Sequence, residues 1–186
     1  MTDAPDGVLL ESERLTLRRF TPADVEALVE LDSDPEVTFF ITGGTPEFAP
    51  PMLDAWLRAY LRWPGYGTFA AIERASGEFV GWFHLRPEAG HGDEPELGYR
   101  LRRSAWGRGL ATEGSRALIE LAFRELGASR VWATTMSVNV ASRRVMEKAG
   151  MRQVRTFHAE WPYPIPGDEQ GDVEYEITRA DWDASR

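Results

Sequence analysis

Residues 97–114, LGYRLRRSAWGRGLATEG, carry the most informative pattern in the sequence. A run of alternating apolar and polar residues ends in a turn that contains Gly107 and Gly109, and an amphipathic helix over about 109–126 follows at once. Glycine lets a backbone approach a ligand closely, and the unpaired N–H groups of a helix start attract anions. The turn therefore predicts a site for a phosphate or a similar anion. Glycines that serve only the geometry of a tight turn explain the same residues.

The segments on either side of this helix predict strands at 95–103 and 130–138. A strand, a helix and a second strand form a crossover, so we expect these two strands to be parallel. The remaining patterns predict an antiparallel meander upstream and a second helix capped by Asn139 that ends at Gly150. The expected fold is α/β (α+β), with a mixed, mostly antiparallel sheet. Further strands are expected at 13–20, 67–74, 78–87, 151–157 and 172–179, and further helices after Thr21 and from about Pro51.

Length and composition exclude several classes of protein. The 186 residues, 42% hydrophobic and 27% charged, predict one domain over 1–186. There is no cysteine, which excludes disulfides and a thiol nucleophile, and the net charge of −9 argues against nucleic acid or a membrane as a partner. No apolar stretch approaches the roughly 20 residues that span a bilayer, and the start lacks a signal-peptide pattern, so we expect a soluble cytoplasmic protein.

Three local features bear on possible ligands. Four arginines and no acid lie between Arg100 and Arg108, which predicts an island of positive potential on an acidic molecule. The histidines at 84, 91 and 158 lack the spacing of metal ligands, so no metal site is expected. The proline-rich segment 158–171 predicts a long loop whose Trp161 and Tyr163 either line a pocket or only pack the loop.

The acidic residues that follow this loop have two interpretations. They form a solvated face, which we favour, or they attract a cationic acceptor. The residues are Asp168, Glu169, Asp172, Glu174 and Glu176.

Two common nucleotide-binding patterns are not matched. The string GxxxxGK[ST] is absent, which excludes a P-loop triphosphatase. The dinucleotide pattern GxGxxG has Thr112 in place of its third glycine, and the strand before it belongs to a meander. A nicotinamide dehydrogenase is therefore a weak alternative.

The stretches LGYRLRRSAWGRGLATEG (97–114) and NVASRRVMEKAGM (139–151) resemble the GNAT superfamily of N-acetyltransferases, and within it the RimJ/RimL ribosomal-protein branch. The second stretch matches that branch's pattern N-x-x-S-x-x-x-x-E-K-x-G-(F/M), and the order of elements over the whole chain agrees. The resemblance implies a twisted sheet with helices on both faces, a parallel strand pair that splays apart, and acetyl-CoA as donor.

The resemblance also implies a set of coenzyme contacts. Family members run the pantetheine arm along the strand that matches Leu101, Arg102 and Arg103. Asn139 and Ser142 match positions that contact the pantetheine and the sulfur. One departure is Trp106, which stands where the family's turn usually has glutamine or arginine. The diphosphate is held on turn amides that match Gly107, Arg108, Gly109, Leu110, Ala111 and Thr112.

Transfer of an acetyl group to an amine benefits from a base, because amines with a pKa near 10 are mostly protonated at neutral pH. Glu96 is the candidate base by its place in the resemblance, and an ordinary surface glutamate is the alternative. Glu113 competes, but its place in the first turn of the helix suits the helix dipole better. Met146 stands where many relatives have a tyrosine that protonates the thiolate, so Ser142, or water, is expected to take that role.

The sequence thus predicts an acetyl-CoA-dependent N-acetyltransferase that uses direct attack in a ternary complex, because no cysteine is present to carry the acetyl group. The acceptor is a protein N-terminus or a small amine. A non-catalytic acyl-CoA-binding module is the alternative from another class, and a homodimer is a further candidate assembly.

Overall fold

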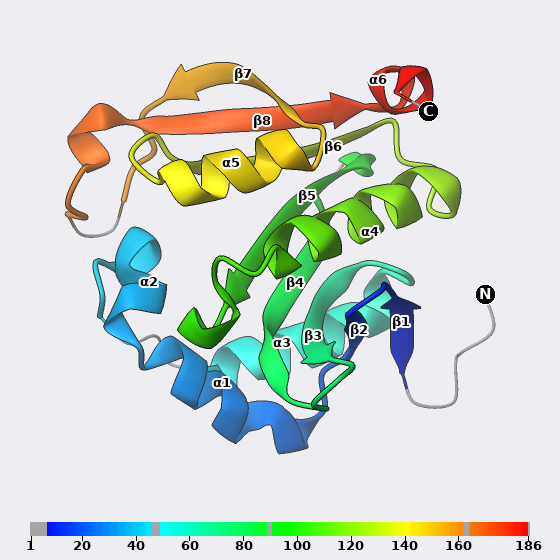
Figure 1. The fold of residues 1–186 in the computed structure, drawn as a ribbon, viewed down its shortest axis with the longest axis vertical. Helices are drawn as coiled ribbons and strands as arrows, with labels where there is room; N and C mark the ends of the chain where they lie inside the picture. Colours follow the sequence, from blue (N-terminus) through cyan, green and yellow to red (C-terminus); the bar gives the residue numbers. More distant parts are fainter. Residues whose placement is uncertain (1–6, 46–48, 89–90, 162–163, 186) are drawn as a thin grey trace.

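The computed structural model describes residues 7–45, 49–88, 91–161 and 164–185. All strands within these residues belong to one sheet with the order β1-β2-β3-β4-β5-β6-β8-β7 (Figure 1). Among the described residues no helix is long and apolar enough to cross a membrane. The strands are β1 (Val8–Glu11), β2 (Leu15–Arg19), β3 (Gly67–Glu73), β4 (Phe79–Glu88), β5 (His91–Leu101), β6 (Arg130–Met136), β7 (Arg152–Phe157) and β8 (Asp172–Thr178). The helices are α1 (Val25–Asp32), α2 (Pro35–Thr42), α3 (Ala49–Arg62), α4 (Leu110–Arg124), α5 (Val140–Lys148) and α6 (Arg179–Ala184), with short 3-10 turns η1 (Pro22–Asp24), η2 (Arg103–Ala105) and η3 (Asp168–Gln170).

The sheet is antiparallel except for the pair β5 and β6, which α4 connects. These two strands pair in register at Glu96 and Trp132, and beyond that point they diverge (Figure 1). The predicted parallel pair and the mostly antiparallel mixed sheet are therefore confirmed. Strand β8 lies between β6 and β7, so the strand order is not the chain order here.

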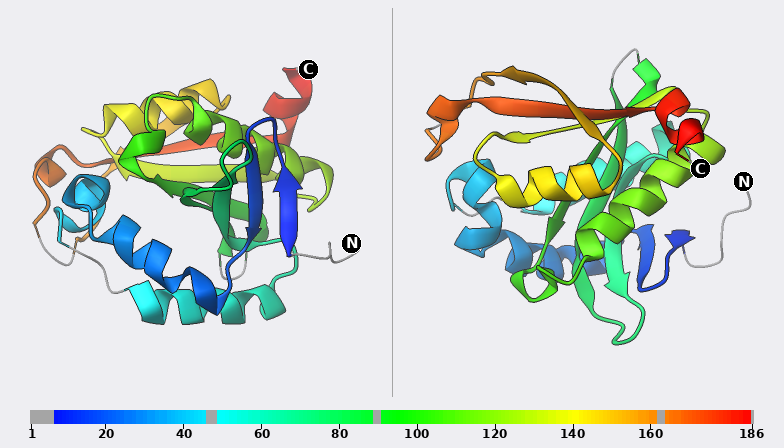
Figure 2. Two further views of the ribbon diagram at one scale, coloured as in Figure 1. Left: turned by 60° about the horizontal axis from the view of Figure 1, so that its bottom comes forward. Right: turned by 45° about the horizontal axis from the view of Figure 1, so that its top comes forward.

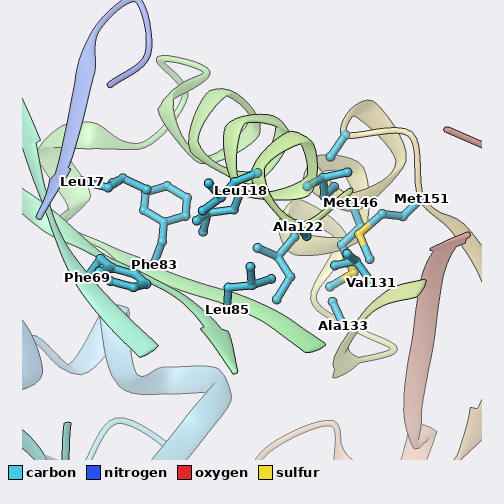
Figure 3. Close-up of a cluster of buried hydrophobic side chains, with 14 of the residues drawn as sticks. Leu17, Phe69, Phe83, Leu85, Leu118, Ala122, Val131, Ala133, Met146 and Met151 are labelled. Atoms are coloured by element: carbon cyan, nitrogen blue, oxygen red, sulfur yellow. The ribbon is translucent and has the colours of Figure 1, made fainter. Parts of the chain in front are cut away.

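Each face of the sheet carries its own apolar cluster, because the strand residues alternate between the two faces. On one face Phe83 and Leu85 pack with Leu118 and Ala122 of α4 (Figure 3). On the other face Trp82 packs with residues of α1, α2 and α3. Figure 2 shows α1 and α3 on one side of the sheet and α4 and α5 on the other. The expectation of helices on both faces is confirmed.

Several predicted helix ends are present. Thr21 and Asp24 form a capping box before α1, in which the carboxylate of Asp24 accepts a hydrogen bond from the Thr21 N–H at 2.7 Å. Asn139 caps α5, because its side-chain oxygen accepts the Ser142 N–H at 3.1 Å. Gly150 follows α5 with a φ of +94°, a conformation that disfavours residues with a side chain.

The sequence patterns failed to predict three elements. Helix α2 was not expected, although Asp34 caps it by accepting the Glu36 N–H at 3.0 Å and Pro35 occupies its first turn. Its sequence PEVTFFIT is rich in β-branched and aromatic residues, which favour strands on propensity alone. Strand β1 is only four residues long, and α6 only six, so neither gives a clear periodic pattern.

The favoured interpretation of the acidic segment as a solvated face is wrong for Asp172 and Glu174. Both residues lie on β8 and are buried, at 3% and 5% exposed. Arg130 on β6 pairs with Glu174 and also with Glu176, while Arg155 on β7 donates to Glu174 at 2.7 Å. These carboxylates therefore link the neighbouring strands of the sheet.

Candidate functional site

A cavity of about 1120 Å³ lies where β5 and β6 diverge. Its wall contains residues from β4, β5, β6, α2, α5 and the start of α4. Most of the residues that the sequence singled out line it, whereas Arg102, Arg103 and Arg108 are not among the described residues of its wall. The predicted residues that line the cavity are Glu96, Leu101, Gly107, Gly109, Leu110, Ala111, Thr112, Asn139 and Ser142.

Strand β5 presents an open edge toward this cavity. The N–H of Arg102 donates to the carbonyl of Val80 at 2.9 Å, so the main-chain groups of Arg102 point toward β4. Because these groups alternate in direction along a strand, those of Leu101 and Tyr99 point the opposite way, toward β6. The strands have already separated there. An extended ligand with amide groups can therefore bind along Tyr99 and Leu101 as an added strand.

Trp106 covers one end of this open edge. Its indole N–H donates to the carbonyl of Leu101 at 2.8 Å, and its side chain is 47% exposed at the cavity wall. This hydrogen bond connects the end of β5 to the residue that follows η2. Trp106 thus makes a polar contact with its own strand.

The turn before α4 offers free donors to the same cavity. Gly107 and Gly109 have φ values of +70° and +80°, which disfavour any side chain, and a Cβ on Gly107 would meet nothing within 4 Å. Backbone conformation, and not lack of space, therefore requires glycine at these two positions. The N–H of Glu113 makes the first α-helical bond, to Gly109. The amides of residues 110–112 precede it and have no partner within the helix, which suits them to an anion.

The β1–β2 loop holds this turn in place. Glu113 accepts hydrogen bonds from the Ser12 hydroxyl and from the Arg14 N–H, both at 2.7 Å. Arg14 also donates to the carbonyl of Arg108 at 2.8 Å. Burial alone would raise the pKa of the Glu113 carboxyl, but the bonds from Ser12 and Arg14 outweigh it and hold that pKa below its usual value. Glu113 is therefore occupied in fixing the turn.

The four arginines between 100 and 108 each face a carboxylate from an earlier part of the chain. The positive island seen in the sequence is thus compensated in the folded protein, and the turn itself offers the cavity its main-chain amides. Arg144 and Lys148 of α5 are further cationic side chains that line the cavity. The pairs are Arg100 with Asp32, Arg102 with Glu30, Arg103 with Glu36, and Arg108 with Glu73.

Glu96 lies at the apex of the divergence and is partly exposed to the cavity. Its Oε2 accepts a hydrogen bond from Arg86 Nη2 at 2.9 Å and lies 3.6 Å from Nε2 of His84. His84 is 7% exposed, lines the cavity, and its Nε2 has no hydrogen-bond partner among the described residues. The absence of a side chain at Gly98 makes room for this ring, because a Cβ there would lie 2.4 Å from Nε2. Sequence reasoning missed His84, since it weighed the histidines only as metal ligands.

Burial lowers the pKa of His84 well below 6.5, and the nearby Arg86 and Arg100 lower it further. The ring is therefore neutral at neutral pH, and its contact with Glu96 is not an ion pair. The unfolded chain takes up a proton at this histidine below a pH of about 6.5, while the folded chain does not. His84 therefore leaves the free energy of unfolding independent of pH above about 6.5, and it makes this free energy decline as the pH falls below that value.

We expect the free energy of unfolding of the wild-type protein to decline below pH 6.5 more steeply than that of a His84→Gln variant. The difference in slope is up to about 1.4 kcal/mol per pH unit, because one proton separates the two states. Urea unfolding at intervals between pH 7.5 and 5 measures both slopes. Equal slopes would contradict the assignment of a neutral buried imidazole.

Tyr99 and Ser142 meet across the cavity. The Tyr99 hydroxyl lies 2.9 Å from Ser142 Oγ, and both residues line the cavity wall. Burial raises the pKa of Tyr99 to about 12, against a smaller lowering by the bond with Ser142, so the phenol stays protonated at neutral pH. Sequence reasoning selected Ser142 but not Tyr99, because the alternation LGYRL indicates only an inward-facing strand residue.

The long loop contributes Trp161 to the cavity wall, as one of the two interpretations predicted. Tyr163 lies outside the described residues. Among the residues that the structure describes there is no group of three or more histidine, cysteine, aspartate or glutamate side chains arranged to hold a metal ion.

Comparison with known proteins gives consistent matches. Residues 14–152 match the family model for the acetyltransferase (GNAT) domain. The chain is 38% identical over 183 residues to an FsC-acetyl coenzyme A-N(2)-transacetylase from Aspergillus fumigatus. The alignment covers 93% of this chain and 77% of that protein.

Solved structures match with similar coverage. The crystal structure of a GNAT-family acetyltransferase from Bacillus anthracis superposes with a TM-score of 0.76 at 27% identity, over 92% of this chain and 98% of the other. A spermidine N-acetyltransferase from Vibrio cholerae, in complex with CoA and spermine, has a TM-score of 0.75 at 15% identity, over 91% and 98% of the two chains. At that identity the second match bears on the fold alone.

Proposed function

The chain belongs to the GNAT acetyltransferase family, and from that premise we propose how its cavity carries out acetyl transfer. The protein is an N-acetyltransferase with acetyl-CoA as the acetyl donor. One observation supports the placement of the coenzyme above all others. The open edge of β5 and the free amides at the start of α4 face the same cavity.

We assign the coenzyme's diphosphate to the turn amides of residues 107–112, which include the unpaired first-turn amides of α4. The pantetheine arm then lies along the main chain of Tyr99 and Leu101, and its sulfur lies near Asn139 and Ser142. Arg102 and Arg103 are not assigned to the pantetheine arm, since neither is among the described residues of the cavity wall and the Arg102 main chain points to β4. Membership of the RimJ/RimL branch stays part of this proposal.

Glu96 is the proposed base. Its place where the two strands part, in the wall of the cavity, supports this proposal. The amine attacks the thioester carbonyl directly in a ternary complex, because the chain has no cysteine to accept the acetyl group. His84 lies beside Glu96, and its neutral ring belongs to the same cavity wall.

The proposed acceptor is a small molecule with a primary amine. Support comes from the Aspergillus relative, which by its name transfers acetyl groups to an N(2) nitrogen. The cavity wall beyond Glu96 also contains apolar rings, among them Phe39 and Trp161, which can pack against the body of such a molecule. A protein N-terminus is the competing acceptor.

An assay of thiol release from acetyl-CoA tests this proposal. It compares a panel of small primary amines with peptides that carry free N-termini, while calorimetry follows acetyl-CoA binding alone. Release that depends on small amines supports the proposal, and release that depends only on peptides makes a protein N-terminus the acceptor. Binding without release in any mixture would favour a non-catalytic module, and no binding would refute the coenzyme placement.

Replacing Glu96 with glutamine is expected to lower kcat at neutral pH by about a hundredfold, because the amide cannot accept the amine's proton. The affinity for acetyl-CoA stays unchanged, since Glu96 lies away from the proposed diphosphate and pantetheine contacts. Glu94→Gln is the matched control on the same strand, because Glu94 does not line the cavity and pairs with Arg130. A kcat for Glu96→Gln within threefold of the control would remove Glu96 from the mechanism.

A further inference from the structure

Tyr99 and Ser142 come from different elements and share one hydrogen bond. Tyr99 reaches the contact from β5, where its ring packs against Phe83 with centroids 5.9 Å apart. Ser142 occupies the third position of α5, and the Asn139 cap fixes its main chain. The 2.9 Å separation of the two hydroxyl oxygens joins the open strand to the helix across the cavity.

The number of hydroxyl hydrogens shared by Tyr99 and Ser142 determines whether the pair can donate a hydrogen bond to a ligand. Two hydroxyl groups carry two hydrogens, and the bond between them uses one. The Tyr99 hydroxyl has two acceptors on Ser142, Oγ at 2.9 Å and the carbonyl oxygen at 3.4 Å. A phenol is a better hydrogen-bond donor than an aliphatic hydroxyl because it is the stronger acid, so we assign the Tyr99 hydrogen to the nearer acceptor, Oγ. The hydrogen of Ser142 is then left for a third group on the cavity side.

The place of this remaining hydrogen follows from the strand geometry. The side chain of Tyr99 lies on the face of the sheet that α4 and α5 cover, and its main chain belongs to the open edge of β5. An arm bound along that edge ends near the start of α5. We propose that Tyr99 positions Ser142 to donate a hydrogen bond to the coenzyme sulfur as the thiolate departs. This inference rests on the proposed acetyl transfer.

The amine nitrogen forms a bond to the carbonyl carbon, the carbon–sulfur bond breaks, and the electron pair leaves on sulfur. The amine's proton goes to Glu96, which releases it to solvent, and the thiolate later takes a proton from solvent, so no net proton is gained or lost. Full transfer from Tyr99 through Ser142 is disfavoured, since a phenol with a pKa of about 12 is a far weaker acid than a thiol near 8.5. The pair therefore stabilises the thiolate by hydrogen bonding.

A Tyr99→Phe variant tests this role, because it keeps the ring and removes only the hydroxyl. Calorimetry measures the affinity for free CoA at several values of pH between 7 and 10. In the wild type we expect the affinity to rise about tenfold as the thiol ionises, and in Tyr99→Phe this rise disappears. The affinity for S-methyl-CoA, which has no ionisable thiol, stays the same in both proteins.

Turnover gives a second readout. We expect Tyr99→Phe to lower kcat with acetyl-CoA about thirtyfold but to change the rate with an activated aryl thioester less than threefold, because an aryl thiolate leaves without help. Tyr66→Phe is the matched control: it removes a buried phenol that bonds to the Gly92 carbonyl at 3.2 Å, outside the cavity wall. Losses that are equal for both donors, or a pH-dependent affinity that survives the substitution, would overturn the inference.

A Ser142→Ala variant repeats the test from the helix side and serves if Tyr99→Phe is unstable. It must show the same loss of pH-dependent CoA affinity. In the double variant, the loss of kcat must not exceed the larger of the two single losses. Additive losses would contradict a coupled pair. If the wild type fails to bind acetyl-CoA, the proposed function itself fails, whereas an active wild type with an unaffected Tyr99→Phe refutes only this inference.

Discussion

A Gly109→Asp variant is expected to bind acetyl-CoA roughly a thousandfold more weakly than the wild type. The added carboxylate would stand at the start of α4, beside the amides to which we assign the diphosphate. Two unit charges of the same sign about 4 Å apart repel by about 4 kcal/mol at an effective dielectric constant of 20, which corresponds to about a thousandfold in affinity. Calorimetry with acetyl-CoA measures the change.

Gly109→Asn is the control that separates charge from shape. Asparagine and aspartate tolerate a positive φ better than other residues with a side chain, and a Cβ at this position would meet only Arg14, at 3.5 Å. Both variants should therefore fold, with a loss of about 1 kcal/mol in stability. The asparagine variant should lose less than tenfold in affinity. Equal losses in the two variants would mean that the turn does not hold an anion.

An Asp32→Ala variant is expected to lose about 3–5 kcal/mol of folding free energy. Asp32 is fully buried on α1 and pairs with Arg100 of β5, whose side chain is 5% exposed. Removing the carboxylate takes an opposite charge away from a guanidinium that stays buried in a low-dielectric interior, where such a loss is costly. Chemical unfolding in urea at neutral pH measures the loss.

Glu30→Ala gives the matched control on the same helix. Glu30 pairs with Arg102, but its side chain is 71% exposed, so water already screens this pair. Its removal should cost less than about 1 kcal/mol. A comparable loss in both variants would show that burial does not decide the strength of these pairs.

The central part of the fold was predictable because local patterns determine it. The strand, turn and helix of 97–114 carry alternation, glycines and helical periodicity within one short stretch, and a crossover then requires the parallel pair. The strand order β6-β8-β7 was not predictable, since it depends on contacts between segments distant in sequence. Helix α2 had its signals in Asp34 and Pro35, but the aromatic and β-branched residues after them indicated the opposite.

The candidate site was predictable where main-chain geometry forms it and unpredictable where tertiary contacts form it. The glycine turn and the Asn139 cap follow from adjacent residues, so both were found. Tyr99 meets a serine 43 positions away, and Arg108 meets Glu73, a residue 35 positions earlier. Contacts between residues so far apart leave no local sequence pattern. For this reason Tyr99 was not among the predicted site residues, and the predicted positive potential at the turn was too high.

The insertion of β8 between β6 and β7 also constrains the order of events during synthesis. Helix α5, with Ser142, follows β6 directly, and the outer edge of β6 stays unpaired until residues 172–178 have left the ribosome. A nascent chain that ends before them exposes a bare strand beside an unfinished cavity. Chaperone binding to shorter nascent chains is the expected consequence.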